Sequence, residues 1–188
     1  MVQFDPQVFL IAVVVVTTLI GLMALYARNR RAEGERLRQR FGPEYDRTVR
    51  ESGSQRRAEA QLASREQRVE RLTLRELTQL ERAQFTKRWN ELQLRFVDSP
   101  KGAVSQADDL LVVLMRSRGY PMSDFEQRAA DISVDHPRVV ENYRTAHDIT
   151  IRLRSGQAST EDLRRAMIHY RMLFDELISP PEEMQRAA

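Results

Sequence analysis

The chain has no cysteine, and several other residue types are scarce among its 188 residues. The lack of cysteine excludes disulfide bonds, thiolate zinc sites and thiol nucleophiles together. Glycine and proline number seven each, which argues against a turn-rich all-β fold. No stretch alternates between apolar and polar residues as a half-buried strand would. We therefore expect an all-α protein of amphipathic helices joined by short turns.

Lysine is nearly absent, and all other basic side chains except the histidines are arginines. The formal net charge is +3 and the sequence pI is about 9.6. The positive excess lies between residues 28 and 72, where thirteen arginines accompany eight acidic residues. After residue 72, seventeen basic residues accompany eighteen acidic ones. A nucleic-acid-binding domain would carry a dense basic stripe on its folded part, so nucleic acid is not an expected partner.

The longest uncharged run contains the apolar stretch from Val8 to Ala27, which reads VFLIAVVVVTTLIGLMALYA. A helix of these 20 residues would be about 30 Å long, which is the thickness of the hydrocarbon core of a bilayer. The run is apolar around its whole circumference, so a buried helix of a water-soluble protein is the weaker interpretation. We predict a short flank at 1–7 and a single transmembrane helix at 8–27.

The flanks of this run predict that the helix is retained and which way it points. A secretory signal has basic residues before its apolar core, whereas residues 1–7 carry only Asp5. Arginines follow the run instead, and the positive-inside rule keeps such a flank in the cytoplasm. We predict a single-pass protein of the cell membrane with a cytoplasmic soluble domain, and an extracytoplasmic domain is the alternative. Anionic lipids attract such arginines, and the candidates are Arg28, Arg30, Arg31, Arg36 and Arg38.

Residues 28–72 are predicted to form a basic juxtamembrane segment and a helical stalk. The Gly42-Pro43 step predicts a bend, because proline disfavours helical geometry just before itself. A second break is expected at residues 52–54. The segment 55–72 then has a thin apolar seam, which is typical either of an exposed stalk or of a short coiled coil that would make a homo-oligomer. The seam consists of Ala58, Leu62, Val69 and Leu72.

From residue 73 to residue 178, broad apolar faces recur at helical spacing and predict a compact bundle of four to five helices. Residues 179–188 are predicted to be a tail. Five helices account for the pattern, and the residues expected to face the core include Phe85, Trp89, Leu92, Phe96, Val104, Ala107, Leu110, Leu111, Leu114, Val140, Tyr143, Ala146, Leu163, Met167, Tyr170, Phe174, Leu177 and Ile178.

Capping signals predict where these helices begin. Thr78 and Ser123 each stand three residues before a glutamate, the spacing of a capping box. Ser99, which precedes Pro100, is predicted to cap a third helix. Asp135 and Ser159 are predicted to cap the remaining two.

No catalytic motif occurs in the chain. No HExxH helix is present, and no glutamate stands three residues before a histidine, so the zinc-protease and di-iron motifs are missing. Nucleophile elbows, phosphate-binding loops and kinase signatures are missing as well. We therefore predict no catalytic, cofactor-binding or metal-binding residue, and an enzyme is the less favoured interpretation.

A small polar site is the alternative to a purely structural bundle. Its candidate residues are Tyr120, Asp135, His136 and His147, which lie in or near the region between predicted helices, where binding sites are often placed. These residues would make the bundle a small-ligand or enzymatic domain.

Three segments carry a resemblance to a known family. They are RLRQRFGPEYDRTV at 36–49, VDSPKGAVSQADDLLVVLMRSRGYPMSDFEQRAADISVDHP at 97–137 and SVDHPRVVENYRTAHDITIRLRSGQASTEDLRRAMIHYRMLFDEL at 133–177. The chain resembles a bacterial family of small helical proteins that are membrane-anchored or secreted. The resemblance implies the same architecture of an anchor followed by helices, and it brings no activity, catalytic residue or cofactor with it.

These patterns together favour a membrane-anchored binding or scaffolding module that acts on a protein partner without evident catalysis. A tether raises the local concentration of what the module binds, which is a sufficient reason for such a design.

Overall fold

The computed structural model describes residues 6–179, without the side chains of residues 6–9 and 11–14. Every regular element in this described part is an α-helix, so the all-α prediction is confirmed. Residues 1–5 and 180–188 lie outside the described residues, and with them most of the predicted N-terminal flank and tail.

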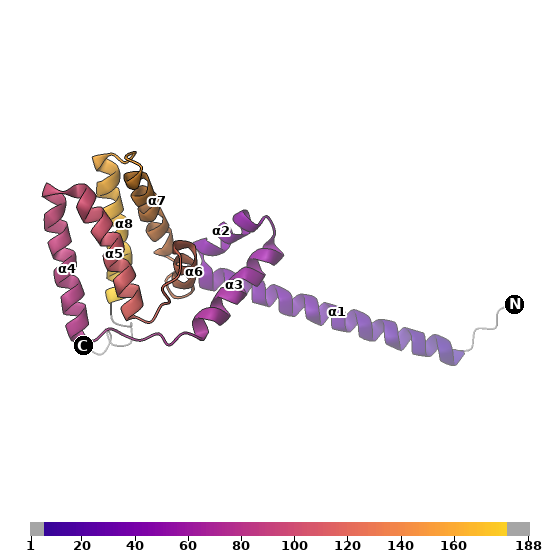
Figure 1. Cartoon of the computed structure of the whole chain (residues 1–188). Coiled ribbons are helices and arrows are strands. Elements are labelled where there is room, and N and C mark those ends of the chain that lie inside the picture. The colour runs from indigo at the N-terminus through magenta and orange to yellow at the C-terminus, as the bar shows by residue number, and fades with distance from the viewer. Residues whose placement is uncertain (1–5, 180–188) are drawn as a thin grey trace. The chain divides into compact units, whose positions relative to one another are not determined.

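Eight helices follow one another along the described residues (Figure 1). They are α1 (Pro6–Phe41), α2 (Pro43–Ser52), α3 (Gln55–Glu70), α4 (Gln79–Asp98), α5 (Pro100–Ser117), α6 (Phe125–Asp135), α7 (Val140–Arg154) and α8 (Thr160–Ile178). The chain divides into two compact units, Met1–Arg40 and Phe41–Ala188.

The helix α1 continues without a break through the predicted span and the arginine-rich residues after it. All side chains from Val15 to Arg31 are exposed, and the large apolar ones have exposed fractions of 51–74%. In the described part of the chain, no helix is both long enough and apolar enough to cross a membrane. The transmembrane span predicted at 8–27 therefore stays a prediction.

Glycines interrupt the chain at both predicted breaks. Gly42 has a φ of 49° and precedes Pro43, which occupies the first turn of α2. Gly53 has a φ of 65° and ends α2, and its N–H donates to the carbonyl of Val49 at 3.1 Å. Residues with a side chain rarely adopt these positive φ angles. The bend and the break thus lie where the sequence predicts them.

The hairpin of α2 and α3 packs against α6 through α3. Ala58, Leu62 and Val69, which belong to the predicted seam, are all buried. The seam therefore faces helices of the same chain.

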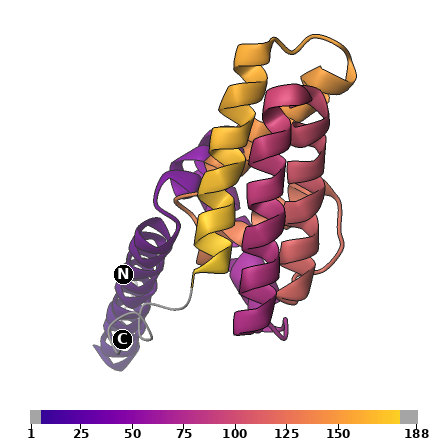
Figure 2. The same ribbon diagram turned by 90° about the vertical axis from the view of Figure 1, so that its left-hand side faces the viewer.

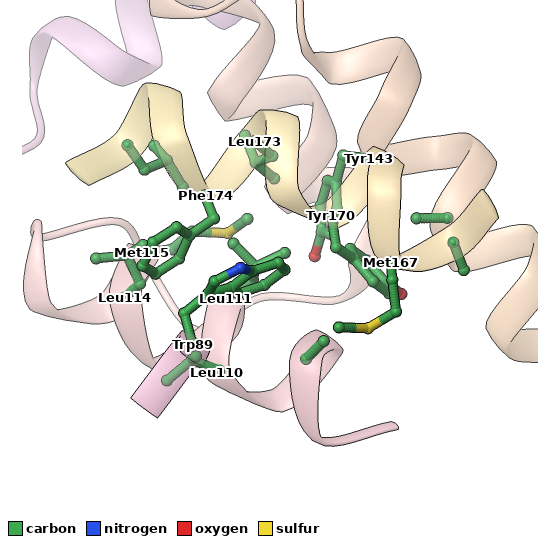
Figure 3. Close-up of a cluster of buried hydrophobic side chains, with 14 of the residues drawn as sticks. Trp89, Leu110, Leu111, Leu114, Met115, Tyr143, Met167, Tyr170, Leu173 and Phe174 are labelled. Atoms are coloured by element: carbon green, nitrogen blue, oxygen red, sulfur yellow. The ribbon is translucent and has the colours of Figure 1, made fainter. Parts of the chain in front are cut away.

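Helices α4 to α8 lie together in the bundle (Figure 2), and their buried side chains form one apolar core. α5 packs against α4, α7 and α8, and α7 packs against α6 and α8. Near the centre of the core, Trp89 stacks on Phe174 with ring centroids 4.7 Å apart (Figure 3). Nearly all the residues predicted to face the core are buried, and Phe96 and Ile178 are partly buried against it. The predicted helical spacing of the core faces is confirmed.

Two of the five predicted helix starts form capping boxes. Thr78 caps α4 together with Glu81, and Ser159 caps α8 together with Asp162. Ser99 occupies the cap position of α5, but its side chain makes no capping hydrogen bond.

The predictions for the other two starts are wrong. The cap of α6 is Asp124, not Ser123, because the Asp124 carboxylate accepts a hydrogen bond from the backbone N–H of Gln127 at 2.8 Å. Asp135 ends α6 instead of capping α7, which begins at Val140. The Asp135 carboxylate is bonded to Tyr120, so it binds a side chain from another part of the fold.

Candidate functional sites

A buried carboxylate joins three helices. Glu44, in the first turn of α2, is 3% exposed. Arg144 of α7 donates two hydrogen bonds to its two oxygens, at 2.7 and 2.9 Å, and Arg65 of α3 donates a third at 2.8 Å. Two parallel bonds from one guanidinium fix the orientation of a carboxylate as well as its position. We call Glu44, Arg65 and Arg144 the Glu44 clamp.

A second buried carboxylate, Asp131 of α6, lies at the contact between α3 and α6. The Arg68 guanidinium of α3 donates to Asp131 at 2.8 Å through Nε, and Gln127 donates at 2.8 Å. Asp131 is fully buried, whereas the Arg68 side chain stays partly exposed. The hairpin is thus bound to the bundle by two ion-paired carboxylates, one from each side of the contact.

Sequence reasoning missed these residues. Arg65 lies 21 positions and Arg144 lies 100 positions from Glu44. No local pattern relates side chains at such separations, so no signal in the sequence could have found the clamp.

An open polar groove of about 640 Å³ lies between α3 and α6. Arg65 and Arg68 line it together with Asp124 and Glu126. The two arginines are already ion-paired with Glu44 and Asp131. Their charge is therefore engaged within the fold and not available to bind an anion.

The structure brings together two of the four residues predicted for a polar site. The hydroxyl of Tyr120 donates to Asp135 at 3.1 Å. Burial raises the pKa of Tyr120 above its ordinary value, and the charge of Asp135 raises it further. Tyr120 therefore stays a neutral donor at physiological pH. His136 follows Asp135 in the chain and contacts Glu176, with 3.0 Å between Nδ1 and Oε1.

His147, the fourth predicted residue, makes different contacts. Its ring stacks on Phe125 with centroids 3.6 Å apart and 6° between the planes. The Nδ1 atom is 3.8 Å from the Asp108 carboxylate, which is too long for a direct hydrogen bond. Of the four predicted residues, Tyr120 and Asp135 thus meet, whereas His136 contacts Glu176 and His147 lies beside Phe125 and Asp108.

Asp108 belongs to a buried polar cluster of α5, α7 and α8. It is 6% exposed, and one of its oxygens lies 3.8 Å from the Arg154 guanidinium. In the same cluster, the hydroxyls of Tyr170 and Thr150 are 2.9 Å apart. Burial raises the pKa of Tyr170, and the charge of Asp108 raises it further. A phenol with a raised pKa donates hydrogen bonds and does not serve as a nucleophile at neutral pH.

The third histidine, His169 of α8, contacts Asn142 at 2.8 Å. Burial lowers its pKa, and the nearby Arg165 lowers it further. Among the described residues, no three acidic or histidine side chains are placed to hold a metal ion.

An apolar groove of about 330 Å³ lies between α4 and α8. Its apolar lining consists of Phe96, Met167, Ile168 and Met172. Val97, the residue next to Phe96 on α4, is 82% exposed. Methionine side chains adapt to partners of different shape. This is the most apolar of the grooves described in the bundle, and Tyr120, Asp135, His136 and His147 do not line it.

Two arginines stand at the edge of the apolar groove. Arg164 is ion-paired with Glu161, and Arg171 is ion-paired with Asp175. Both arginines are about half exposed, and exposed ion pairs of this kind are worth at most about 1 kcal/mol. A carboxylate from another molecule could replace either partner at little cost.

The basic residues predicted to contact lipid all lie on α1. Arg28, Arg30, Arg31, Arg36 and Arg38 are exposed. Arg36 donates two hydrogen bonds to Glu33, at 2.7 and 3.0 Å. The five residues therefore do not share one environment.

No family model, no curated protein and no solved structure matches the chain. The resemblance to a bacterial family of anchored helical proteins stays a prediction, and function has to be inferred from these sites.

Proposed function

We propose that the chain is a single-pass membrane protein whose helical bundle is a protein-binding module held at the membrane by α1. The observation that carries this proposal is the exposure of every side chain from Val15 to Ala27, apolar on all sides of the helix. Apolar surface left in water costs about 25 cal/mol per Å². A bilayer would cover such a helix all round, and the helix satisfies its own backbone hydrogen bonds there.

Alkaline carbonate extraction of native membranes tests the anchor. We expect the full chain to stay in the membrane pellet and the double variant Leu19→Arg/Met23→Arg to move to the supernatant. An arginine near the centre of a span opposes insertion by about 3 kcal/mol. The matched control is Leu94→Arg/Val97→Arg, which places the same charges on exposed positions of α4. Recovery of the unaltered full-length chain from the supernatant would refute the anchor.

The basic flank of α1 supports a cytoplasmic bundle, through the positive-inside rule. A C-terminal fusion to alkaline phosphatase should be inactive in this orientation. An active fusion would place the bundle outside the cytoplasm and leave the anchor itself unaffected.

The apolar groove of α4 and α8 supports protein binding by the bundle. Its volume and methionine lining suit two or three apolar side chains on one face of an amphipathic helix. Arg164 and Arg171 at its edge complement acidic residues on the flank of that helix. We therefore expect the partner to offer an amphipathic helix with acidic flanking residues.

Photocrosslinking in living cells tests this surface. A photoreactive residue at Ile168, in the groove, should crosslink to one defined partner, and the same residue at Ile151 of α7, which is also about half exposed, should not. The additional change Arg171→Glu should reduce the product about tenfold, because it repels an acidic flank. Equal crosslinking from both positions would argue against the groove.

Two other functions have less support. A small-ligand or enzymatic site around Asp135, His136 and His147 is less favoured, because these side chains contact different partners. A homo-oligomer formed through 55–72 is less favoured, because the apolar seam of that segment is buried in its own chain.

A further inference from the structure

The arginines of α1 divide into two groups by their distance from the apolar segment. At a rise of about 1.5 Å per residue, Arg28, Arg30 and Arg31 lie about 2 to 6 Å beyond Ala27 along the helix, whereas Arg36 lies about 14 Å beyond it. The headgroup layer on each side of a bilayer is roughly 5 to 8 Å thick. If the span ends at Ala27, only the first group lies at the depth of the lipid phosphates.

The two groups also differ in their partners. Arg36 is bound to Glu33, and the Glu35 carboxylate accepts a hydrogen bond from Gln39 at 3.1 Å. In the part of the chain that the structure describes, no carboxylate is paired with Arg28, Arg30 or Arg31. The three guanidinium groups nearest the apolar segment therefore have their donors free for other acceptors.

The direction of these three side chains suits lipid better than a single compact ligand. Successive helix positions turn by about 100°, so Arg28 and Arg31 lie about 60° apart on one side of the helix, and Arg30 points away from both. Lipids surround a membrane helix on all sides and present phosphate groups to each direction. Arginine donates bidentate hydrogen bonds to phosphate, and its long aliphatic stem lets the head reach the headgroup layer.

We propose that Arg28, Arg30 and Arg31 form a collar that binds the phosphates of anionic lipids, while Arg36, Arg38 and Arg40 lie beyond the headgroups. This inference rests on the proposed membrane anchoring of α1 and identifies the lipid chemistry that the anchor meets. It also narrows the five arginines predicted from the sequence to the three nearest the span.

Fluorescence quenching in vesicles measures the lipid preference directly. The full chain carrying Tyr26→Trp, two residues before the collar, is reconstituted in mixed phosphatidylcholine and phosphatidylglycerol, with either lipid brominated in separate samples. The indole at position 26 then reports which lipid is its neighbour, and Trp89, which is buried in the bundle, adds a constant background. We compare Arg28→Gln/Arg30→Gln/Arg31→Gln with a control of equal charge change, Arg36→Gln/Arg38→Gln/Arg40→Gln.

We expect the first triple variant to lose its preference for phosphatidylglycerol by about fivefold for each arginine whose contact is removed. The control triple should stay within about twofold of the unaltered chain. Equal losses in both triples, or no loss in the first, would overturn the collar. Circular dichroism verifies that both variants keep their helix content.

A carbonate wash of the same vesicles separates this inference from the anchor on which it rests. Release of the chain by the wash would refute the anchor and the collar together. A chain that resists the wash but shows no change of lipid preference in the first triple would refute only the collar.

Discussion

Within the same compact unit, the interactions that stabilise the α4–α8 bundle differ from those that attach the α2–α3 hairpin to it. The bundle has an apolar core in which large side chains such as Trp89, Tyr170 and Phe174 are fully or almost fully buried. The hairpin is attached through Glu44 and Asp131, each buried and bound by arginine. Apolar burial is non-directional and stabilises many similar packings, whereas a buried ion pair is favourable only in one geometry. We infer that the core supplies most of the stability and that the ion pairs determine how the hairpin docks.

The largest effect should come from the bundle core. Trp89→Ala removes a side chain that is 1% exposed and stacked on Phe174, so it should lower the free energy of unfolding by about 4 kcal/mol. Leu94→Ala, at a position of the same helix that is 75% exposed, should change it by less than about 0.5 kcal/mol. Urea unfolding of the full chain in detergent, followed by circular dichroism, gives both values. Equal effects would mean that α4 does not pack against the core through the face that carries Trp89.

The Glu44 clamp should come next. Glu44→Gln leaves two arginines without their carboxylate, and breaking a buried ion pair in this way costs about 3 kcal/mol. The exposed Glu51→Gln, which removes a partner of Arg47, is the matched control and should have little effect. Hydrogen exchange should show faster exchange in α2 and α3 while α8 keeps its protection.

A triple variant sharpens the distinction between charge and packing. Glu44→Leu combined with Arg65→Met and Arg144→Met replaces all three members of the clamp with apolar side chains, and it should recover most of the stability lost in Glu44→Gln. No recovery in urea unfolding would mean that the contact depends on more than the charge balance.

The seam of α3 should behave as core and not as an oligomer interface. Leu62→Ala removes a fully buried side chain and should cost about 2 to 3 kcal/mol. The mass of the full chain in detergent, measured by light scattering, should be the same with and without this change. A smaller mass in the variant would instead support the homo-oligomer through 55–72.

The smallest effect concerns Glu81, a partly exposed carboxylate in the first turn of α4. Two hydrogen bonds lower the pKa of Glu81 from 4.5 to about 2. The bond from the Arg75 side chain is the larger cause, and the bond from the backbone of Thr78 is the second. Because the folded pKa is lowered, this contribution is present above pH 4.5 and is lost as the pH falls to about 2. Glu81→Gln should therefore lower the thermal midpoint at pH 7 but not near pH 2. Glu91→Gln, which removes an exposed carboxylate from the same helix, is the matched control.

Local signals predicted the fold well because they act within one turn of a helix. The capping box at Thr78 and the glycines at positions 42 and 53 end or begin helices through neighbours in the chain. Where a distant residue intervened, the prediction was wrong. Aspartate often caps helices, but the hydroxyl of Tyr120 donates to the Asp135 carboxylate, and Asp135 is the last residue of α6.

The candidate sites were predicted less well, for a related reason. Tyr120 and Asp135 do meet, because they lie next to the segments that connect α5, α6 and α7, whereas the His136 side chain contacts Glu176 of α8. His147 has the same residue type as His136, but its place one turn after Tyr143 directs it towards Phe125 and Asp108. Residue type alone does not specify which neighbours a side chain meets.

The sequence by itself determined the helical class, the faces that are buried, most of the helix boundaries and the apolar character of residues 8–27. These properties follow from the period of the helix and from hydrogen bonds between residues at most four positions apart. Only the tertiary structure decided that Glu44 meets Arg144 and that the α3 seam is covered by its own chain. Those contacts depend on how whole helices are placed in space, and the periodicity of any one helix does not contain that information.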